Sequence, residues 1–201
     1  LKDAPPEHEG SASFVFDPAD PVPTIGGAIA SGAPVMDAGA FDQREFEGLY
    51  GATHIGRAIA DRGDVLVFET APLERAVEVA GEVEAHLWVA SDAPDTDITI
   101  TLIDVHPPNG DYPEGYCMNL THGILRLRFR EGFEAAKLMK AGQTYRIKIE
   151  GYPTANRFMP GHRIRVHVSS SNFPHFDVNP NTGAPAGEPT TARKARNTIL
   201  F

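Results

Sequence analysis

Seven serines are the residues of this chain that could serve as a catalytic nucleophile. A serine nucleophile on a strand-to-helix elbow needs glycine two residues before and two residues after it, because the backbone there is strained and the helix packs closely. None of the seven has these neighbours. The run Ser169–Ser171 ends an expected strand, where hydroxyls commonly satisfy backbone groups. We therefore assign no catalytic residue to this chain.

Histidines are the next residues that could do chemistry, as metal ligands. His162 and His167 are an odd number apart, so on one strand they would point to opposite faces and could not share a metal ion. Cys117 is the only cysteine, which excludes an intrachain disulfide and a thiolate cluster. We expect no metal site and no cofactor. Three further histidines lie in separate expected loops, where sequence cannot show whether they meet: His106, His122 and His175.

Four aspartates form an acidic stretch around the start of an expected strand: Asp92, Asp95, Asp97 and Asp104. Carboxylate oxygens are the ligands that Ca²⁺ prefers, and sandwich domains can bind this ion. Aspartate also caps turns through its own side chain. We favour the turn-capping role for these residues.

The charge of the chain argues against nucleic acid as a partner. The formal net charge is −9 and the pI is near 5.3, so a phosphate backbone would be repelled on average. The best basic patch is Arg126, Arg128 and Arg130, which alternate with apolar residues. This alternation indicates the solvated face of a strand.

Trp88 is the aromatic residue that could form a binding platform. It lies on the polar side of its expected strand, beside His86 and Glu84. An exposed tryptophan can stack on a sugar, and it can equally pack under a loop or against another domain. We favour packing.

Alternating apolar and polar residues dominate the chain from residue 64 onward, and this pattern is typical of antiparallel sheet with one wet face. Turn-rich connections separate the segments, and no helix of a dozen residues lies between them, which excludes a parallel sheet of βαβ units. Many such strands must pack sheet on sheet. The expected strands are 65–68, 82–89, 98–102, 124–130, 144–150 and 164–168.

The first sixty or so residues differ from the rest and are expected to be irregular. Residues 1–13 are expected to be a linker, and they do not resemble a signal peptide. Three prolines in residues 17–23 prevent a regular helix or ladder. The spacing of apolar residues in 41–50 predicts one short helix. No apolar run reaches the length of about 20 residues that spans a bilayer, so we expect no membrane partner.

Several segments, in this order, resemble the C-terminal domain of the X-Pro dipeptidyl-peptidase, cocaine esterase and α-amino-acid ester hydrolase family of serine hydrolases. The first runs from Phe14 to Gly27, with the sequence FVFDPADPVPTIGG. The others are Asp42-Gln43 followed by 64–68, 87–97 (LWVASDAPDTD), 161–166 (GHRIRV), and 169–183 (SSSNFPHFDVNPNTG).

The resemblance implies an all-β, mainly antiparallel jelly-roll sandwich of the galactose-binding-domain-like kind over residues 14–201. It also implies that the Ser–His–Asp triad belongs to a separate N-terminal α/β-hydrolase domain, which is absent from this chain and is its expected partner. Members usually continue past 197–201 into a further strand, and homo-oligomers are a further expectation. The residues expected to contact the hydrolase domain are Asp17, Pro23, Thr24, Gly26, Gly27, Trp88, Phe173, His175 and Phe176.

We therefore expect a non-catalytic accessory domain of a serine hydrolase that cleaves ester or peptide bonds. The alternative is a stand-alone carbohydrate-binding sandwich that uses Trp88 and loop aromatics for stacking. With one cysteine and no visible export signal, a cytoplasmic location is expected. The substrate of the parent enzyme is chosen in the hydrolase domain, so this chain does not indicate it.

Overall fold

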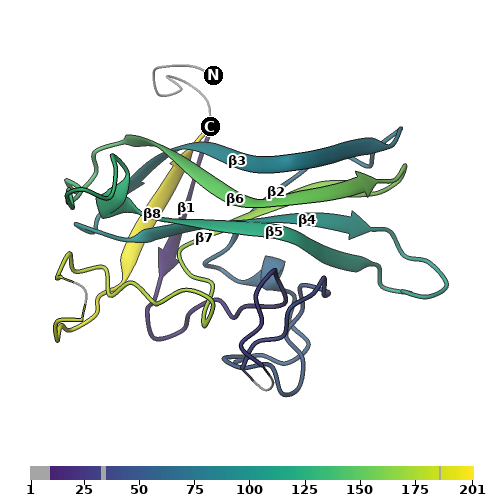
Figure 1. Ribbon diagram of the computed structural model, residues 1–201, viewed down its shortest axis with the longest axis horizontal. Coiled ribbons are helices and arrows are strands. Elements are labelled where there is room, and N and C mark those ends of the chain that lie inside the picture. The colour runs from purple at the N-terminus through teal and green to yellow at the C-terminus, as the bar shows by residue number, and fades with distance from the viewer. Residues whose placement is uncertain (1–9, 33–34, 186) are drawn as a thin grey trace.

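A computed structural model describes residues 10–32, 35–185 and 187–201, and it is an all-β protein (Figure 1). Two short 3-10 turns, η1 (Ile59–Asp61) and η2 (Leu127–Phe129), interrupt the connections. The strands are β1 (Ser11–Phe16), β2 (Leu66–Glu69), β3 (Val77–Ser91), β4 (Asp97–His106), β5 (Tyr116–Arg126), β6 (Tyr145–Phe158), β7 (Arg163–Ser169) and β8 (Ala195–Leu200).

The strands follow the order β1-β8-β3-β6-β5-β4-β7-β2, and each neighbouring pair is antiparallel. The first four form one layer and the last four form the second, which is the strand order of a jelly roll. A single pairing, Gly123 with Gly151, connects β5 to β6 and so joins the layers. The expected all-β jelly-roll sandwich is confirmed.

The main core lies between the two layers and follows from the alternation in the sequence. Val89 of β3, Ile147 of β6 and Ile199 of β8 face Ile98 and Ile100 of β4. All five side chains are nearly inaccessible to solvent. Because successive strand residues point to opposite faces, the polar residues between them lie on the outer surfaces.

Three expectations about local structure need correction. Residues 41–50 form turns and isolated bridges rather than a helix, because several of their backbone groups pair with residues 56–59 and with β5. The expected strand 124–130 ends at Arg126, where the chain enters η2. The sheet begins at Ser11, inside the expected linker of residues 1–13, of which residues 1–9 lie outside the described part.

An irregular layer, formed by residues 17–32 and 35–65, covers the outer face of the second sheet. The outward side chains of β4 and β7 include Thr99, Thr101, His167 and Ser169, which sequence reasoning would leave in water. Thr99, His167 and Ser169 are at most 5% exposed. The layer contributes its own small apolar core of Val22, Ile25, Ile59 and Val65 above these polar groups. These polar side chains are buried because the irregular layer covers the outer face of β4 and β7.

Polar contacts hold this irregular layer in one conformation. The Arg62 guanidinium is buried and makes two bonds to the Asp64 carboxylate, at 2.8 and 2.9 Å. Glu45 is 1% exposed and accepts bonds from the backbone N–H groups of Thr53 and His54, each at 2.7 Å. These charged groups replace the backbone ladders that a regular element would supply.

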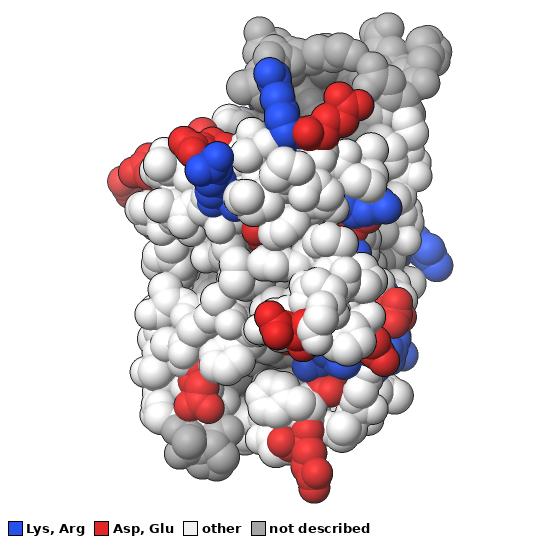
Figure 2. Space-filling model, turned by 90° about the vertical axis from the view of Figure 1, so that its right-hand side faces the viewer, with Lys and Arg blue, Asp and Glu red and all other residues white. Residues whose placement is uncertain are grey.

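Acidic and basic side chains are interspersed on the surface. Figure 2, which views the molecule from the right-hand side of Figure 1, shows charges of both signs separated by broad uncharged areas. Within the described residues, no helix is long and apolar enough to cross a membrane.

Candidate interdomain face

Two segments far apart in sequence form the centre of the candidate site. Pro23 and Phe173 form a parallel bridge, and the Thr24 N–H donates to the Phe173 carbonyl at 2.7 Å. The Phe173 N–H donates to the Val22 carbonyl at 2.9 Å, and the His175 N–H donates to the Thr24 hydroxyl at 3.2 Å. The proline-rich segment is therefore fixed to the segment that follows β7.

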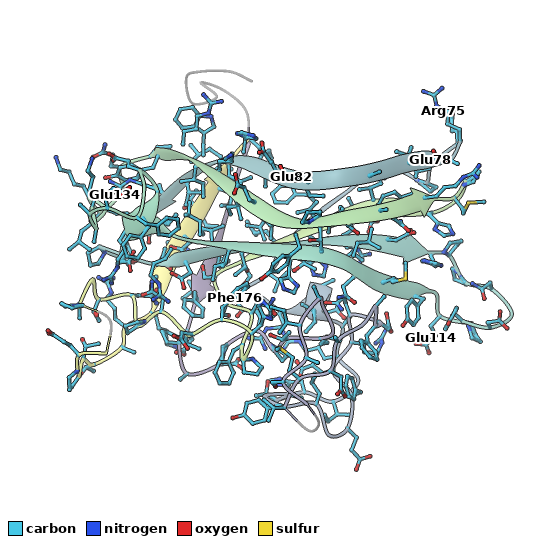
Figure 3. All side chains as sticks on the ribbon, viewed as in Figure 1. Arg75, Glu78, Glu82, Glu114, Glu134 and Phe176 are labelled. Carbon is cyan, nitrogen blue, oxygen red and sulfur yellow. The ribbon has the colours of Figure 1, made fainter. Side chains whose placement is uncertain are left out.

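Aromatic rings fill the space between these segments and the sheet. The ring of His122, which projects outward from β5, lies 4.5 Å from the His175 ring and 5.8 Å from the Phe176 ring, centroid to centroid. Tyr152 of β6 meets His122 edge to face at 5.6 Å. Figure 3 shows Phe176 beside β5, on the side where the loops lie. The cluster connects the loops to both layers of the sandwich.

His122 acts in this cluster as an aromatic group without charge. Burial lowers its pKa from 6.5 to about 4, and the nearby His175 adds to the effect. Burial also lowers the pKa of His175. Both imidazoles are therefore neutral near pH 7, so the cluster packs without placing a positive charge under the loops.

Gly26 and Gly27 allow the proline-rich segment to approach this cluster. Their φ angles are 69° and 119°, which side-chain-bearing residues rarely adopt. A Cβ at Gly27 would lie 2.5 Å from Cε1 of His122, and one at Gly26 would lie 2.3 Å from the Gly39 carbonyl oxygen. Any larger residue would push the segment off the sheet.

Large apolar side chains are exposed around this centre. Phe41, Phe46 and Tyr50 are 37%, 47% and 44% exposed, and they line a cavity of about 240 Å³ together with Thr24 and Gly26. The rings of Phe173 and Tyr50 are 5.9 Å apart, centroid to centroid, with 38° between their planes. We call the surface formed by residues 23–27, 41–50 and 173–176 the loop face. Exposed apolar patches of this kind mark interaction sites.

The structure brings together seven of the nine residues expected at an interdomain contact, and it separates the other two. The seven that meet at the loop face are Pro23, Thr24, Gly26, Gly27, Phe173, His175 and Phe176. Asp17 lies instead next to Lys194, with their charged groups 2.7 Å apart. Trp88 lies on β3 in the other layer and is half-buried.

Trp88 borders a second, apolar cavity where the two layers come apart. This cavity has a volume of about 450 Å³ and lies between β2 and β7 on one side and β3 and β8 on the other. Phe68, Leu87, Leu200 and Phe201 complete much of its lining. The packing role expected for Trp88 fits this position better than a flat platform for sugars.

In the acidic stretch, the carboxylates of Asp95 and Asp97 are paired with arginines. Asp97 makes two bonds to Arg126, each 2.9 Å long, and Asp95 bonds to Nε of Arg128 at 2.8 Å. The side-chain amide of Asn179 donates to both aspartates, at 2.9 and 2.7 Å. Burial raises the pKa of Asp97, and the Arg126 ion pair opposes this.

The same network corrects the expectation for the basic patch. Arg126 and Arg128 do not lie on a solvated strand face: Arg128 is 8% exposed, and Arg126 is half-buried in its ion pair. The guanidinium of Arg130 lies over the Tyr145 ring, 4.3 Å from its centroid. The strand ends at Arg126, so strict alternation does not describe where Arg128 and Arg130 point.

The serine run has the structural role expected from the sequence. Ser169 Oγ donates to the Asp64 carbonyl at 2.7 Å, and Ser171 Oγ accepts the Val22 N–H at 2.9 Å. Ser170 Oγ pairs with the side-chain amide of Asn197 at 2.8 Å. These hydroxyls hold the irregular layer and β8 to the end of β7.

One group of titratable residues was not predicted as a unit. Asp104, His106 and His162 place one possible ligand atom each within 4.8 Å of the others. The sequence suggested only that Asp104 belonged to the acidic stretch and that His106 lay in a loop with unknown neighbours. The separation of two between Asp104 and His106 was the available signal, because residues i and i+2 share a strand face.

Comparisons with known proteins agree with this geometry. The cocaine esterase of Rhodococcus sp. (strain MB1 Bresler) is 43% identical over 175 residues, a match that covers 87% of this chain and 27% of the esterase. The crystal structure of an aminopeptidase from a marine sediment archaeon (Thaumarchaeota archaeon) matches 98% of this chain and 32% of that chain, with a TM-score of 0.75 and 31% identity. The structure of an α-amino acid ester hydrolase matches 96% of this chain and 31% of that chain, with a TM-score of 0.76 and 29% identity.

The chain thus spans about a third or less of the length of these relatives. The family model described as the X-Pro dipeptidyl-peptidase C-terminal non-catalytic domain matches residues 3–201. The match covers nearly the whole chain and agrees with the jelly-roll order of the strands. The chain therefore belongs to the family of X-Pro dipeptidyl-peptidase C-terminal non-catalytic domains.

Proposed function

We propose that this chain is the accessory domain of a serine hydrolase and that its loop face packs on the N-terminal α/β-hydrolase domain of the same protein. In this role the chain supports the cleft in which the neighbouring domain cleaves ester or peptide bonds. Relatives with the names cocaine esterase, α-amino acid ester hydrolase and aminopeptidase support hydrolysis of such bonds by the parent protein.

The exposed apolar groups of the loop face are the observation that carries the proposal. Phe46 and Tyr50 expose nearly half of their surface although they lie beside well-ordered buried groups such as Glu45. Interdomain contacts within one chain resemble protein–protein interfaces, in which aromatic residues are enriched. The polar bonds below the face hold the aromatic side chains in position before docking, which lowers the entropy cost of association.

The carbohydrate-binding alternative is not supported. The family to which the chain belongs is described as the C-terminal non-catalytic domain of X-Pro dipeptidyl-peptidase, not as a carbohydrate-binding module. Trp88 is half-buried, so part of its surface is not available to stack on a sugar.

A charged substitution on the loop face tests the proposal. We expect Phe46→Asp in the parent protein to lower kcat/KM for a p-nitrophenyl ester by about tenfold, because a carboxylate in an apolar contact costs at least 1–2 kcal/mol. The measurement is steady-state hydrolysis by the full-length protein, together with the thermal unfolding temperature.

Phe133→Asp is the matched control. Phe133 is 81% exposed and lies on the connection between η2 and β6, with its ring centroid 5.5 Å from that of Phe129. We expect this variant to keep the activity of the unmodified protein. Equal activity in both variants would show that Phe46 faces solvent in the parent, and the loop face would then not be the contact surface.

A further inference from the structure

A small polar cluster lies inside the sandwich at the end opposite the β8–β1 strands. Asp104 and His106 project inward from the C-terminal end of β4. His162 lies in the turn between β6 and β7. β4 pairs with both β5 and β7, and the His162 N–H bonds to the Met159 carbonyl at 3.1 Å. The backbone therefore holds all three residues in fixed positions.

The three side chains converge on one point. Nδ1 of His162 lies 2.8 Å from Oδ1 of Asp104, and Nε2 of His106 lies 3.6 Å from Oδ2 of the same carboxylate. The two imidazole rings are 4.2 Å apart, centroid to centroid, with 39° between their planes. The three nearest ligand atoms are all within 4.8 Å of one another.

A second ring of contacts orients these groups. The side-chain amide of Asn156, from β6, donates to Oδ2 of Asp104 at 3.0 Å. Tyr116 meets the His106 ring edge to face, with the centroids 6.1 Å apart. Contacts of this kind fix ligand orientation at metal sites and are part of what makes such sites bind.

The cluster leaves buried groups incompletely satisfied. Nε2 of His106 is buried and has no hydrogen-bond partner among the described residues. An unpaired buried nitrogen is unfavourable, so a ligand that satisfies it has a driving force.

Asp104 differs from the buried carboxylates of Asp95 and Asp97 in the groups that balance its negative charge. Asp95 and Asp97 are each neutralised by an arginine. Asp104 is only 2% exposed, and its ion pairs within the described part of the chain are with His106 and His162. Among the described residues, no arginine or lysine forms an ion pair with this buried carboxylate.

We propose that Asp104, His106 and His162 bind one Zn²⁺ ion, with a solvent molecule as the fourth ligand. Two imidazoles and one carboxylate suit Zn²⁺ better than Ca²⁺ or Mg²⁺, which prefer oxygen ligands. A tetrahedral Zn²⁺ with bonds of about 2.0–2.2 Å places its ligand atoms about 3.3 Å apart. A cavity of about 320 Å³, lined in part by His106 and Tyr116, adjoins the cluster.

The metal ion would tie β4 to the turn between β6 and β7 and so stabilise this end of the sandwich. The test is isothermal titration of the 201-residue chain, stripped with EDTA, with ZnCl₂ at pH 7.5. We expect one Zn²⁺ per chain and a higher unfolding temperature with Zn²⁺. Co²⁺ in place of Zn²⁺ should give the strong visible absorption of a four-coordinate site.

His106→Gln should lower the affinity for Zn²⁺ by a hundredfold or more, because it removes one of three ligands; circular dichroism checks that the variant folds. His86→Gln is the matched control, because His86 is a half-exposed histidine that pairs with Glu84 at 3.1 Å on β3. Its affinity should not change. Equal Zn²⁺ affinity in His106→Gln and the unmodified chain would overturn the proposal. So would the absence of both Zn²⁺ heat and Co²⁺ absorption in the unmodified chain at millimolar metal.

Discussion

Replacing Asp95 with alanine is expected to lower the free energy of unfolding by about 3–5 kcal/mol. Asp95 is fully buried and accepts bonds from the backbone N–H and Nε of Arg128, at 2.9 and 2.8 Å. Its other partner is the amide of Asn179. The substitution leaves the Arg128 guanidinium, which is 8% exposed, without its counter-charge in a region from which water is excluded. Urea-induced unfolding followed by circular dichroism measures the loss.

Glu78→Ala provides the comparison for Asp95. Glu78 also pairs with an arginine, Arg157, but the two charged atoms are 3.6 Å apart and both side chains are more than half exposed. Exposed pairs contribute at most about 1 kcal/mol. Figure 3 shows Glu78 near the tip of β3, away from the core. If both variants lost the same small amount, the buried network would not hold the 95–97 and 179–181 segments together as we describe.

Gly123→Ala is expected to have the second large effect, a loss of about 3 kcal/mol in stability. Gly123 pairs with Gly151 where β5 meets β6, which is the pairing that joins the two layers. A Cβ at Gly123 would lie 2.3 Å from the Glu150 carbonyl oxygen and 2.9 Å from its carbon. Backbone atoms cannot move aside as a flexible side chain can, so the layers must separate.

Gly110→Ala controls for the loss of glycine itself. Gly110 lies in the connection between β4 and β5, and a Cβ there meets no atom within 4 Å. We expect a change of less than about 0.5 kcal/mol, as for other surface substitutions. The measurement is the thermal unfolding temperature of both variants. If Gly123→Ala were as stable as Gly110→Ala, the two layers would have room for a Cβ at this junction.

Alternation in the sequence predicted the sheet well because each strand buries one face. Residues such as Val89 and Ile147 pack between the layers, as the period of two requires. The pattern failed at Arg126 and Arg128, where ion pairs to buried aspartates outweigh the usual preference of arginine for water. The helix predicted over 41–50 from the spacing of its apolar residues is also wrong, because this segment forms turns that pair with other segments.

The candidate site was predictable only in part. The resemblance pointed to residues 23–27 and 173–176, and the structure places these two segments side by side. The contribution of His122 could not be read from the sequence, because it depends on how a loop crosses the outer face of β5. The cluster around Asp104 needed the same kind of information, since the turn that carries His162 meets β4 through long-range pairing.

The central claim is that the loop face is the surface on which this domain meets its hydrolase partner. Hydrogen–deuterium exchange tests it most directly, by comparing the isolated 201-residue chain with the same residues inside the parent protein. We predict that the amides of residues 23–27, 41–50 and 173–176 exchange more slowly in the parent. The amides around Glu78 and Trp88 should be unchanged. Slower exchange around Trp88, with no change at the loop face, would contradict the account.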